Sequence, residues 1–370
     1  MKFSTRAIHV PATRHDGAIA PPIHLSTTFE HGPANEAIAA HEYVRSGNPN
    51  VDALEARLAS LEGGVAALAF ASGMAASHAL QSSLPAGSEI LLHKDTYYDT
   101  RTIAREFMEP LGIRHRVLDL RDAAAVDAAL SGETSMVWLE TPSNPRLDII
   151  DIADLAAKAH AVGAKLTVDS TFATPAVQRP IALGADYVMH SMTKFMGGHS
   201  DIMGGALIFG DDTDLAERLK YRRTLSGAVL SPFNAWLISR GLQTLDCRVE
   251  RHSANALSVA QLLEAHPAVA RTNYPFLESA PAYELATRQM RSGGGMLSFE
   301  MQGGRDAAIR VASRVKLFVN ATSLGGVESL IEHRASIEGP MSASPDNLLR
   351  VAVGLEHPDD LIADLEAALS

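Results

Sequence analysis

Six short apolar runs, separated by segments with helical periodicity, constrain the fold of this 370-residue chain more than any other feature. The runs fall at 65–71, 89–93, 136–140, 165–169, 187–190 and 206–209. Between two of them, Asp151 and Gly163 are typical of the start and the stop of an amphipathic helix. Strands that alternate with helices in this way predict a mainly parallel sheet covered by helices on both faces, and hence an α/β fold.

The same patterns divide the chain into three parts. Residues 1–47 contain few periodic apolar positions and are expected to form an extended arm. Residues 48–245 hold the alternating strands and helices of a large domain, which begins with a helix at about 50–62 capped by Asn50. The pattern then changes to a long helix followed by a strand and further helix–strand units, which predicts a smaller C-terminal α/β domain at 246–370.

Charge and cysteine content exclude several classes of function. The chain has 32 Lys and Arg against 43 Asp and Glu, a net charge of −11, which disfavours nucleic acid or an anionic membrane as a partner. Its single cysteine, Cys247, suits a cytoplasmic location, and its place in a helical pattern predicts core packing. The N-terminal segment lacks a long apolar stretch, so no secretory signal is expected. The segment 41–45 begins like a zinc-protease helix but has Arg45 where the second histidine belongs, so no metal site is expected.

A lysine and an aspartate follow two consecutive apolar runs. Lys194 lies in His-Ser-Met-Thr-Lys, just past the fifth run, and Asp169 closes the fourth. Such a lysine can hold pyridoxal 5′-phosphate (PLP) as a Schiff base, and the carboxylate can pair with the pyridinium nitrogen. A buried carboxylate without a cationic partner is costly, and the pyridinium would supply one for Asp169, for which helix capping is the alternative. The pair predicts a PLP-dependent enzyme of amino-acid chemistry with Lys194 as a catalytic residue.

Other residues near the predicted strand ends fit the phosphate of such a cofactor. The turn after the first apolar run leads into a helix, where small residues leave backbone N–H groups open to an anion. The residues of this turn are Ser72, Gly73 and Met74. Ser191 and Thr193, beside Lys194, can add two hydroxyl groups. Taken singly, each of these residues also fits an ordinary turn.

Tyr97 follows the second apolar run, and Asn144 follows the third within Glu-Thr-Pro-Ser-Asn-Pro. An aromatic ring at the first position can stack on a cofactor ring, and an amide at the second can bond its phenolic oxygen. A core tyrosine and a turn asparagine are the alternatives for the two residues taken alone. Ligands bind beyond the carboxyl ends of the strands in parallel sheets, so the order of all these residues together favours one cofactor site.

Eight motifs spread over nearly the whole chain carry a resemblance to a known family. They are Tyr-Val-Arg-Ser-Gly-Asn-Pro-Asn at 43–50, Leu-Glu-Gly-Gly at 61–64, Ala-Ser-Gly-Met-Ala at 71–75, Glu-Thr-Pro-Ser-Asn-Pro at 140–145, Val-Asp-Ser-Thr-Phe-Ala-Thr-Pro at 168–175, the lysine-containing run at 190–201, Ser-Leu-Gly-Gly-Val-Glu-Ser-Leu at 323–330 and Leu-Arg-Val-Ala-Val-Gly-Leu at 349–355. With these motifs the chain resembles the Cys/Met-metabolism group of fold-type I PLP-dependent enzymes. The resemblance implies the fold-type I architecture and the cofactor roles given above.

Further roles are implied by the resemblance alone. Tyr43 and Arg45 match residues that reach into a neighbouring subunit's site to bind the cofactor phosphate, which implies a dimeric unit and a tetramer built from two such dimers. Arg350 matches the arginine that binds the substrate α-carboxylate, and Ser323 matches a nearby position that orients the substrate. Tyr97, close to the cofactor ring, is expected to donate or accept a proton during the reaction.

The implied activity is γ-elimination or γ-replacement on sulfur-containing or O-acyl amino acids, of the cystathionine γ-lyase or γ-synthase type. A cystathionine β-lyase or methionine γ-lyase type of carbon–sulfur lyase and an aminotransferase are the alternatives, since the same fold supports all of them. Thr322 stands where a glutamate is common, Ser170 stands where Asn is common, and the segment 333–340 replaces the more usual His-Pro-Ala. These departures leave the exact substrate and the physiological direction open.

Overall fold

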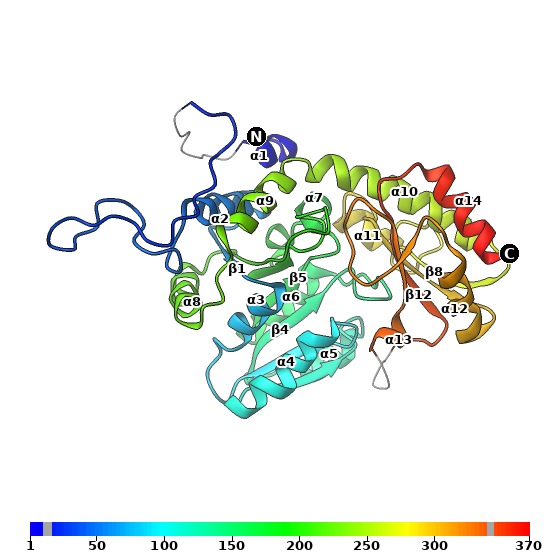
Figure 1. The fold of residues 1–370 in the computed structure, drawn as a ribbon. Coiled ribbons are helices and arrows are strands. Elements are labelled where there is room, and N and C mark those ends of the chain that lie inside the picture. The colour runs from blue at the N-terminus through cyan, green and yellow to red at the C-terminus, as the bar shows by residue number, and fades with distance from the viewer. Residues whose placement is uncertain (10–16, 339–343) are drawn as a thin grey trace.

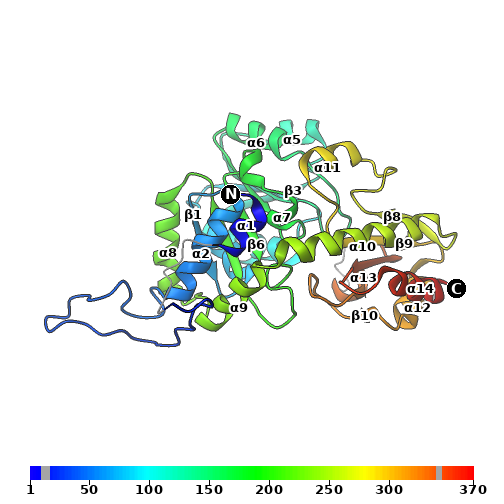
Figure 2. The same ribbon diagram turned by 90° about the horizontal axis from the view of Figure 1, so that it is seen from above.

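The computed structural model describes residues 1–9, 17–338 and 344–370. A seven-stranded sheet lies at the centre of the molecule, and a five-stranded sheet lies beside it (Figure 1). The long helix α10 (Leu245–Ala265) runs from the first sheet to the second, as the view from above shows (Figure 2). At one end it packs against the helices α7 (Thr174–Val177) and α9 (Pro232–Leu242). At the other end it packs against the strands β8 (Val269–Asn273) and β9 (Met296–Met301) of the second sheet.

The large sheet contains the six strands expected from the apolar runs and one more. In sheet order the strands are β1 (Ala66–Phe70), β7 (Gly205–Phe209), β6 (Tyr187–Ser191), β5 (Lys165–Asp169), β4 (Thr134–Glu140), β2 (Glu89–His93) and β3 (Arg114–Leu118). The strands from β6 to β3 run parallel, and β7 is antiparallel to both of its neighbours. The expected mainly parallel sheet is confirmed. Strand β3 was missed because it lies at the sheet edge, where its sequence Arg-His-Arg-Val-Leu is partly exposed and lacks an apolar run.

Helices cover both faces of this sheet. They are α2 (Pro49–Glu62), α3 (Gly73–Gln81), α4 (Tyr98–Ile103), α5 (Ala123–Ala129), α6 (Ile152–Ala161), α7 (Thr174–Val177), α8 (Thr213–Ser226) and α9 (Pro232–Leu242), with short turns η1 (Ala104–Met108), η2 (Glu109–Leu111) and η3 (Pro180–Leu183). Leu80 of α3 and Leu219 of α8 share one buried cluster with Phe70 of β1. Leu155 of α6 packs with Val137 of β4 in a different cluster. Side chains alternate between the two faces along each strand, so they contribute to separate hydrophobic layers above and below the sheet.

The cap of the first large helix differs from the expectation. The Asn48 side chain accepts a 2.9 Å hydrogen bond from the backbone N–H of Asn50, so Asn48 rather than Asn50 is the N-cap of α2. Pro49 takes the first helical position, where a missing N–H costs nothing. The Asn50 side chain instead holds the arm, by donating to Pro22 O at 2.8 Å and accepting from His24 N at 2.8 Å.

The N-terminal arm is extended only in part. The first residues form a short helix, α1 (Phe3–Ile8), that packs against α2 and α10, which corrects the expectation of an extended arm there. Residues 21–24 contact the body through Asn50 and Trp236, and beyond them the chain leaves it as a long loop, visible at the left of Figure 1. Two antiparallel bridges, Thr28 with Tyr43 and His31 with Ala37, turn this loop into a narrow hairpin.

The second sheet carries the C-terminal part of the chain. In sheet order its strands are β10 (Val319–Asn320), β11 (Leu330–His333), β12 (Leu348–Ala352), β9 (Met296–Met301) and β8 (Val269–Asn273). All neighbours are antiparallel except β10 and β11. The remaining helices are α11 (Tyr283–Gln289), α12 (Gly304–Arg314), α13 (Arg334–Glu338) and α14 (Pro358–Leu369). Helices α10, α12 and α14 bury one face of this sheet, with Leu263, Val311 and Leu361 in a common core.

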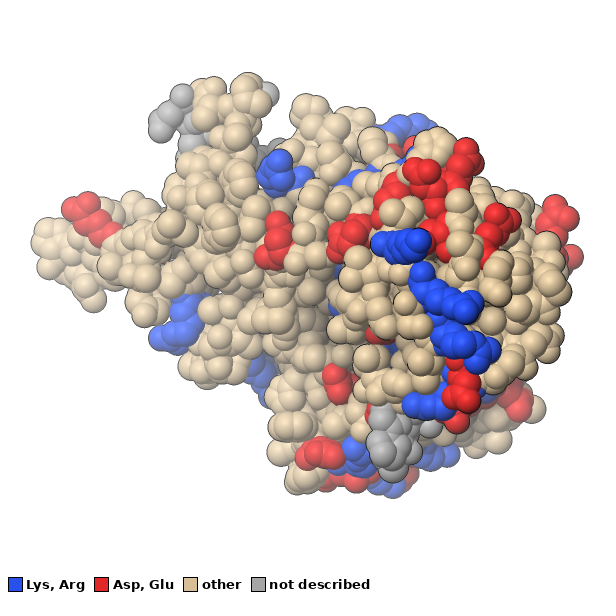
Figure 3. All heavy atoms as spheres, turned by 45° about the vertical axis from the view of Figure 1, so that its right-hand side comes forward, with Lys and Arg blue, Asp and Glu red and all other residues tan. Residues whose placement is uncertain are grey.

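The surface carries both acidic and basic side chains, and the position of Cys247 differs from the expectation. On the face shown in Figure 3, several basic side chains form a stripe over the C-terminal part, and acidic side chains gather next to it. Cys247 is exposed on α10, so the expectation that it packs in the core is wrong. Within the described ranges, no helix has both the length and the apolar content needed to cross a bilayer.

Candidate active site

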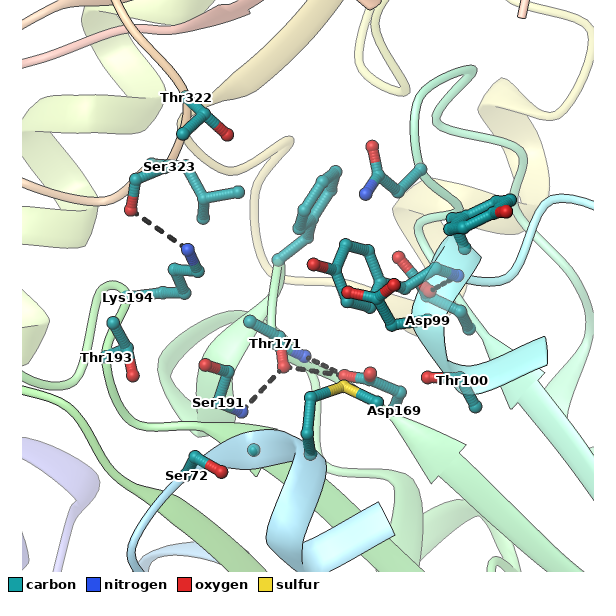
Figure 4. Close-up of a pocket in the computed structure, with 18 of the residues that line it drawn as sticks. Ser72, Asp99, Thr100, Asp169, Thr171, Ser191, Thr193, Lys194, Thr322 and Ser323 are labelled. Atoms are coloured by element: carbon teal, nitrogen blue, oxygen red, sulfur yellow. Dashed lines mark hydrogen bonds between the residues drawn. The ribbon is translucent and has the colours of Figure 1, made fainter. Parts of the chain in front are cut away.

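A cavity of about 470 Å³ opens where the carboxyl ends of the parallel strands meet the second sheet (Figure 4). All the site residues expected from the sequence line it, except Tyr43 and Arg45. These lining residues are Ser72, Gly73, Met74, Tyr97, Asn144, Asp169, Ser191, Thr193, Lys194, Ser323 and Arg350. Most of them come from the segments that follow β1, β2, β4, β5 and β6, which end at the same edge of the sheet.

Lys194 projects into this cavity from the turn after β6. Its Nζ donates a 2.9 Å hydrogen bond to Ser323 Oγ, drawn in Figure 4. Burial and, to a smaller extent, the nearby Arg350 charge lower the pKa of the Lys194 amine to about 8, and Glu332 opposes the shift. A substantial fraction of the amine is therefore neutral near pH 8, as a nucleophilic amine must be.

Asp169, at the end of β5, is a buried carboxylate held by hydroxyl and backbone donors only. Its Oδ1 accepts from Thr171 Oγ1 at 2.6 Å and from Thr171 N at 3.0 Å (Figure 4). Burial raises the pKa of the Asp169 carboxyl, and the two Thr171 hydrogen bonds oppose that rise. No lysine, arginine or histidine of the described ranges forms an ion pair with it. An unpaired acid at this depth suits a cationic N–H donor from a ligand.

The N-terminus of α3 and the start of the lysine turn face one another. Ser72 caps α3, because its side chain accepts from Ala75 N at 3.1 Å. A Cβ at Gly73 would come 3.1 Å from Ser191 Cβ and 3.3 Å from Ser191 Oγ, so any other residue here would crowd Ser191. The Thr193 hydroxyl accepts from the backbone N–H of Gly204 at 3.1 Å. The first N–H groups of α3 and the Ser191 hydroxyl therefore bound a small anion-binding corner.

Tyr97 immediately precedes α4 and is fixed through its backbone. Its N–H donates to Glu140 Oε2 at 2.6 Å, which ties the segment after β2 to the end of β4. Burial raises the pKa of the Tyr97 phenol to about 12, and a hydrogen bond with Asp99 contributes. The phenol therefore stays protonated throughout the physiological range.

Arg350 lies on β12 and lines the cavity from the side of the second sheet. Its two terminal nitrogens donate to Asn144 Oδ1 at 3.1 Å and to Ser323 O at 3.1 Å, and it forms a close ion pair with Glu332. Burial lowers the pKa of the Arg350 guanidinium to about 10. Arg350 thus joins the end of β4, the loop before β11 and the second sheet at one point.

Tyr43 and Arg45 lie outside the cavity of their own chain. The Tyr43 side chain is exposed, and the Arg45 guanidinium stacks over the Tyr43 ring at 5.4 Å from its centroid. Arg45 Nη1 donates to Thr224 O at 3.0 Å on α8. The hairpin that carries Tyr43 points away from the body in Figure 1.

Several lining residues were missed by the sequence interpretation. Thr171 lies within the quoted motif after β5, so a hydroxyl two residues past the aspartate was a usable signal. Glu140 also lines the cavity, and its position as the last residue of a predicted strand was a similar signal. Arg334 and Glu338 of α13 also line the cavity. They lie in the segment that departs from the family pattern, and a sequence departure alone does not show which way a side chain points.

One group of the described residues has the spacing of a metal site. Ligand atoms of His93, Asp95 and Asp148 all lie within 4.8 Å of one another. His93 Nδ1 accepts from Leu120 N at 3.1 Å, so the neutral ring carries its proton on Nε2 and has no lone pair there for a cation. Arg121 Nη1 also pairs with Asp148 Oδ1 at 2.7 Å. The cluster is better described as a hydrogen-bonded ion-pair group than as a metal centre.

The fold and the cavity define a PLP-dependent enzyme of fold type I. The chain belongs to the Cys/Met metabolism PLP-dependent enzyme family, whose model matches residues 4–370. It is 45% identical to a cystathionine gamma-synthase of Mycobacterium tuberculosis over 99% of this chain and 96% of the relative. It is 41% identical to a cystathionine beta-lyase of Lactococcus lactis, over 99% and 98% of the two chains.

Solved structures agree with this assignment. The structure of metB from Corynebacterium glutamicum has a TM-score of 0.97 and 40% identity, and covers 100% of this chain and 98% of its own. A cystathionine gamma-lyase, CalE6, from Micromonospora echinospora has a TM-score of 0.94 and 38% identity, with 100% and 99% covered. PLP is therefore the cofactor, and the cavity fits it. Lys194 offers an amine of lowered pKa, Asp169 an unpaired buried acid, and the start of α3 free N–H groups.

Proposed function

We propose that this chain catalyses γ-elimination or γ-replacement on sulfur-containing or O-acyl amino acids in transsulfuration, as a cystathionine γ-lyase or γ-synthase does. The observation that carries the proposal is a cavity that combines Lys194, Asp169 and Arg350, in a chain similar over nearly its full length to a γ-synthase. PLP, when bound, supplies the electron sink for a carbanion at the substrate Cα.

Lys194 and Asp169 are proposed to perform the central acid–base work. Lys194 would hold the cofactor through its amine, and the same amine would accept the Cα proton of the substrate. A pKa near 8 suits both tasks, because the amine must exist in its neutral form close to physiological pH. Asp169 holds a proton at the ring nitrogen, and the bonds from Thr171 fix the carboxylate that does so.

The substrate-facing residues are proposed to orient the amino acid. Arg350 binds the α-carboxylate, since a guanidinium matches its two oxygens. The amide oxygen of Asn144 is already engaged by Arg350, which leaves its amide N–H groups for the phenolic oxygen of the cofactor. Ser323 orients the substrate beside Lys194. Tyr97 stacks on the cofactor ring and, as a protonated phenol, donates a proton to the leaving group.

The phosphate is proposed to be held from two subunits. In one subunit, the N–H groups of Gly73 and Met74 at the start of α3, with Ser72, Ser191 and Thr193, provide the anion-binding corner. Tyr43 and Arg45 of the partner subunit complete it, which their exposed position away from their own cavity supports. We propose a dimer with shared sites, and a tetramer formed by two such dimers.

The proposal also covers the division of the chain and its location. The hairpin within the arm at 1–47 is proposed to serve the neighbouring subunit, 48–245 to bind PLP, and 246–370 to contribute substrate-binding residues. The single cysteine of the chain is in keeping with a cytoplasmic location.

Product analysis tests the reaction type. Purified enzyme is supplied with cystathionine, with O-succinylhomoserine plus cysteine, and with methionine. Cysteine with 2-oxobutyrate, or net synthesis of cystathionine, supports γ chemistry. Homocysteine with pyruvate from cystathionine would contradict γ chemistry and indicate β-cleavage. This is the second candidate, because the chain is also similar to a β-lyase. Thiol release from methionine alone would indicate a methionine γ-lyase, and transfer of the amino group to a second keto acid an aminotransferase.

A further inference from the structure

Four buried charged side chains form a continuous chain of ion pairs beside the cavity. Glu332 Oε1 accepts from Arg334 Nη1 at 3.0 Å and also pairs closely with Arg350 Nη2. On its other side, Arg334 Nη2 donates to Glu338 Oε1 at 2.7 Å. None of the four side chains is more than 9% exposed. A single carboxylate oxygen of Glu332 is therefore shared by two guanidinium groups.

This arrangement matters because Arg350 must attract a substrate carboxylate. A glutamate in direct contact with Arg350, in a site of low dielectric, would cancel most of the charge that a substrate would meet. Arg334 contacts the same oxygen of Glu332. With Glu338 included, the four groups carry no net charge. Arg334 acts by drawing part of the negative charge of Glu332 away from Arg350, because both guanidinium groups contact the same carboxylate oxygen. Glu338 contacts Arg334 from within α13, with no hydrogen bond or ion pair to Arg350 within the described ranges.

We propose that Arg334 is a positioning residue that keeps Arg350 available for the substrate α-carboxylate by sharing Glu332 with it. The proposal rests on the proposed function, in which Arg350 binds that carboxylate. Arg334 stands in the segment where this sequence departs from the usual His-Pro-Ala, so the link is a feature of this chain. Arg334 also lines the cavity, and the experiment below separates its action through Glu332 from direct contact with the ligand.

The test measures binding of two ligands that differ only in the carboxylate. L-alanine and ethylamine are titrated into the PLP-loaded enzyme, and dissociation constants are taken from the visible spectrum of the cofactor and from calorimetry. In Arg334→Met, the affinity for L-alanine should fall by about tenfold or more, the scale of one charge-assisted hydrogen bond. The affinity for ethylamine should stay the same. In the double variant Arg334→Met/Glu332→Gln, which removes the competing charge, L-alanine affinity should return to within about threefold of wild type.

Two further variants control for damage to the fold. Arg334→Lys keeps the charge and should bind L-alanine nearly as wild type does. Arg305 also holds α13, by donating to Ser336 Oγ at 3.1 Å, but it lies on the exposed side and pairs with Asp346. Arg305→Met should leave the affinities for both ligands unchanged.

Each other outcome overturns the inference. Unchanged L-alanine affinity in Arg334→Met would do so, and equal loss for both ligands would indicate general damage to the site. Weaker L-alanine binding that Glu332→Gln does not restore would assign Arg334 a direct contact with the ligand. If Arg334→Met does not fold, Glu332→Gln alone decides, since it must bind L-alanine at least as tightly as wild type. Loss of selectivity in Arg350→Met checks the proposed role of Arg350 separately.

Discussion

Lys194 Nζ lies 2.9 Å from Ser323 Oγ, so the amine that follows β6 of the large sheet contacts the loop between β10 and β11 of the second sheet. The backbone oxygen of the same serine accepts from Arg350. Ser323 therefore joins the amine proposed to hold the cofactor to the guanidinium proposed to bind the substrate carboxylate. The site exists only when the two sheets are docked together, and neither sheet holds all of its groups.

Replacement of Lys194 by Ala should abolish turnover and remove the visible absorbance of covalently held PLP, because no other amine of the described residues lines the cavity. The matched control is Lys158→Ala. It removes a lysine of α6 that pairs with Asp127 of α5, outside the cavity, and should leave both properties unchanged. Absorption spectra and turnover assays after addition of PLP measure both. Retention of the absorbance in the Lys194 variant would contradict its assignment.

Capture of PLP by the apoenzyme should depend on pH through Lys194. The reactive form is the neutral amine, whose pKa is about 8. The rate should rise about tenfold per pH unit below that value and level off above it. The Arg350 charge contributes to the low pKa, so Arg350→Met should move the midpoint upward. Stopped-flow absorbance over pH 6–10 measures the midpoint, and one near 10.5 in wild type would refute the lowered pKa.

Asp169→Asn should lower activity by on the order of 100-fold or more while it stabilises the apoenzyme at neutral pH. Burial raises the pKa of the folded-state carboxyl above its unfolded value of 3.8, so the folded protein binds more protons. The stability of the wild-type apoenzyme therefore falls as pH rises from 3.8 through the raised pKa of Asp169. The amide side chain of the variant does not ionise, so the variant does not lose this stability. The advantage of Asp169→Asn should disappear at acid pH, where both forms are neutral.

Urea unfolding of the two apoenzymes at several pH values measures this difference. Asp186→Asn is the matched control, because Asp186 is equally buried but pairs with Lys165 at 2.7 Å and with His160 at 2.8 Å. Its removal leaves Lys165 without its partner and should destabilise the protein. A stabilising effect of both substitutions would mean that ionisation of Asp169 is not the cause.

Two inactive variants should restore activity to one another if the sites are shared. In a mixed dimer of Lys194→Ala and Arg45→Glu, one site combines an intact Lys194 with an intact Arg45 of the partner subunit. Random exchange of subunits makes about half of the dimers mixed, so recovery should approach about a quarter of wild-type activity. Co-expression with two affinity tags isolates the mixed species. No recovery in the mixed dimer would show that each site is complete within one chain.

Much of the site was visible in the sequence because its residues are local to strand ends. Asp169 closes an apolar run, and Lys194 and Asn144 follow others within a few positions. Parallel strands end at one edge, so the pattern alone brought these residues together. The apolar runs themselves identified six strands of the large sheet, whereas β3 carries its charge at an exposed edge and gave no such signal.

Contacts between segments far apart in the chain could not be predicted from this pattern. Asn48 displaced Asn50 as the cap of α2 because Asn50 is occupied by the arm, and Cys247 faces solvent because α10 turns its other side to the core. Arg334 stood out in sequence only as a departure from a family pattern. The pairing of β11 with β12 places Glu332 opposite Arg350, and Arg334 is linked to Arg350 through Glu332.

The amino-acid sequence by itself determined the alternating fold, the cofactor and the order of the groups around it, since these depend on periodicity and on residues next to strand ends. Only the tertiary structure decided which side chains share a proton or a charge, because those pairings depend on how the two sheets dock and on which atoms burial removes from water.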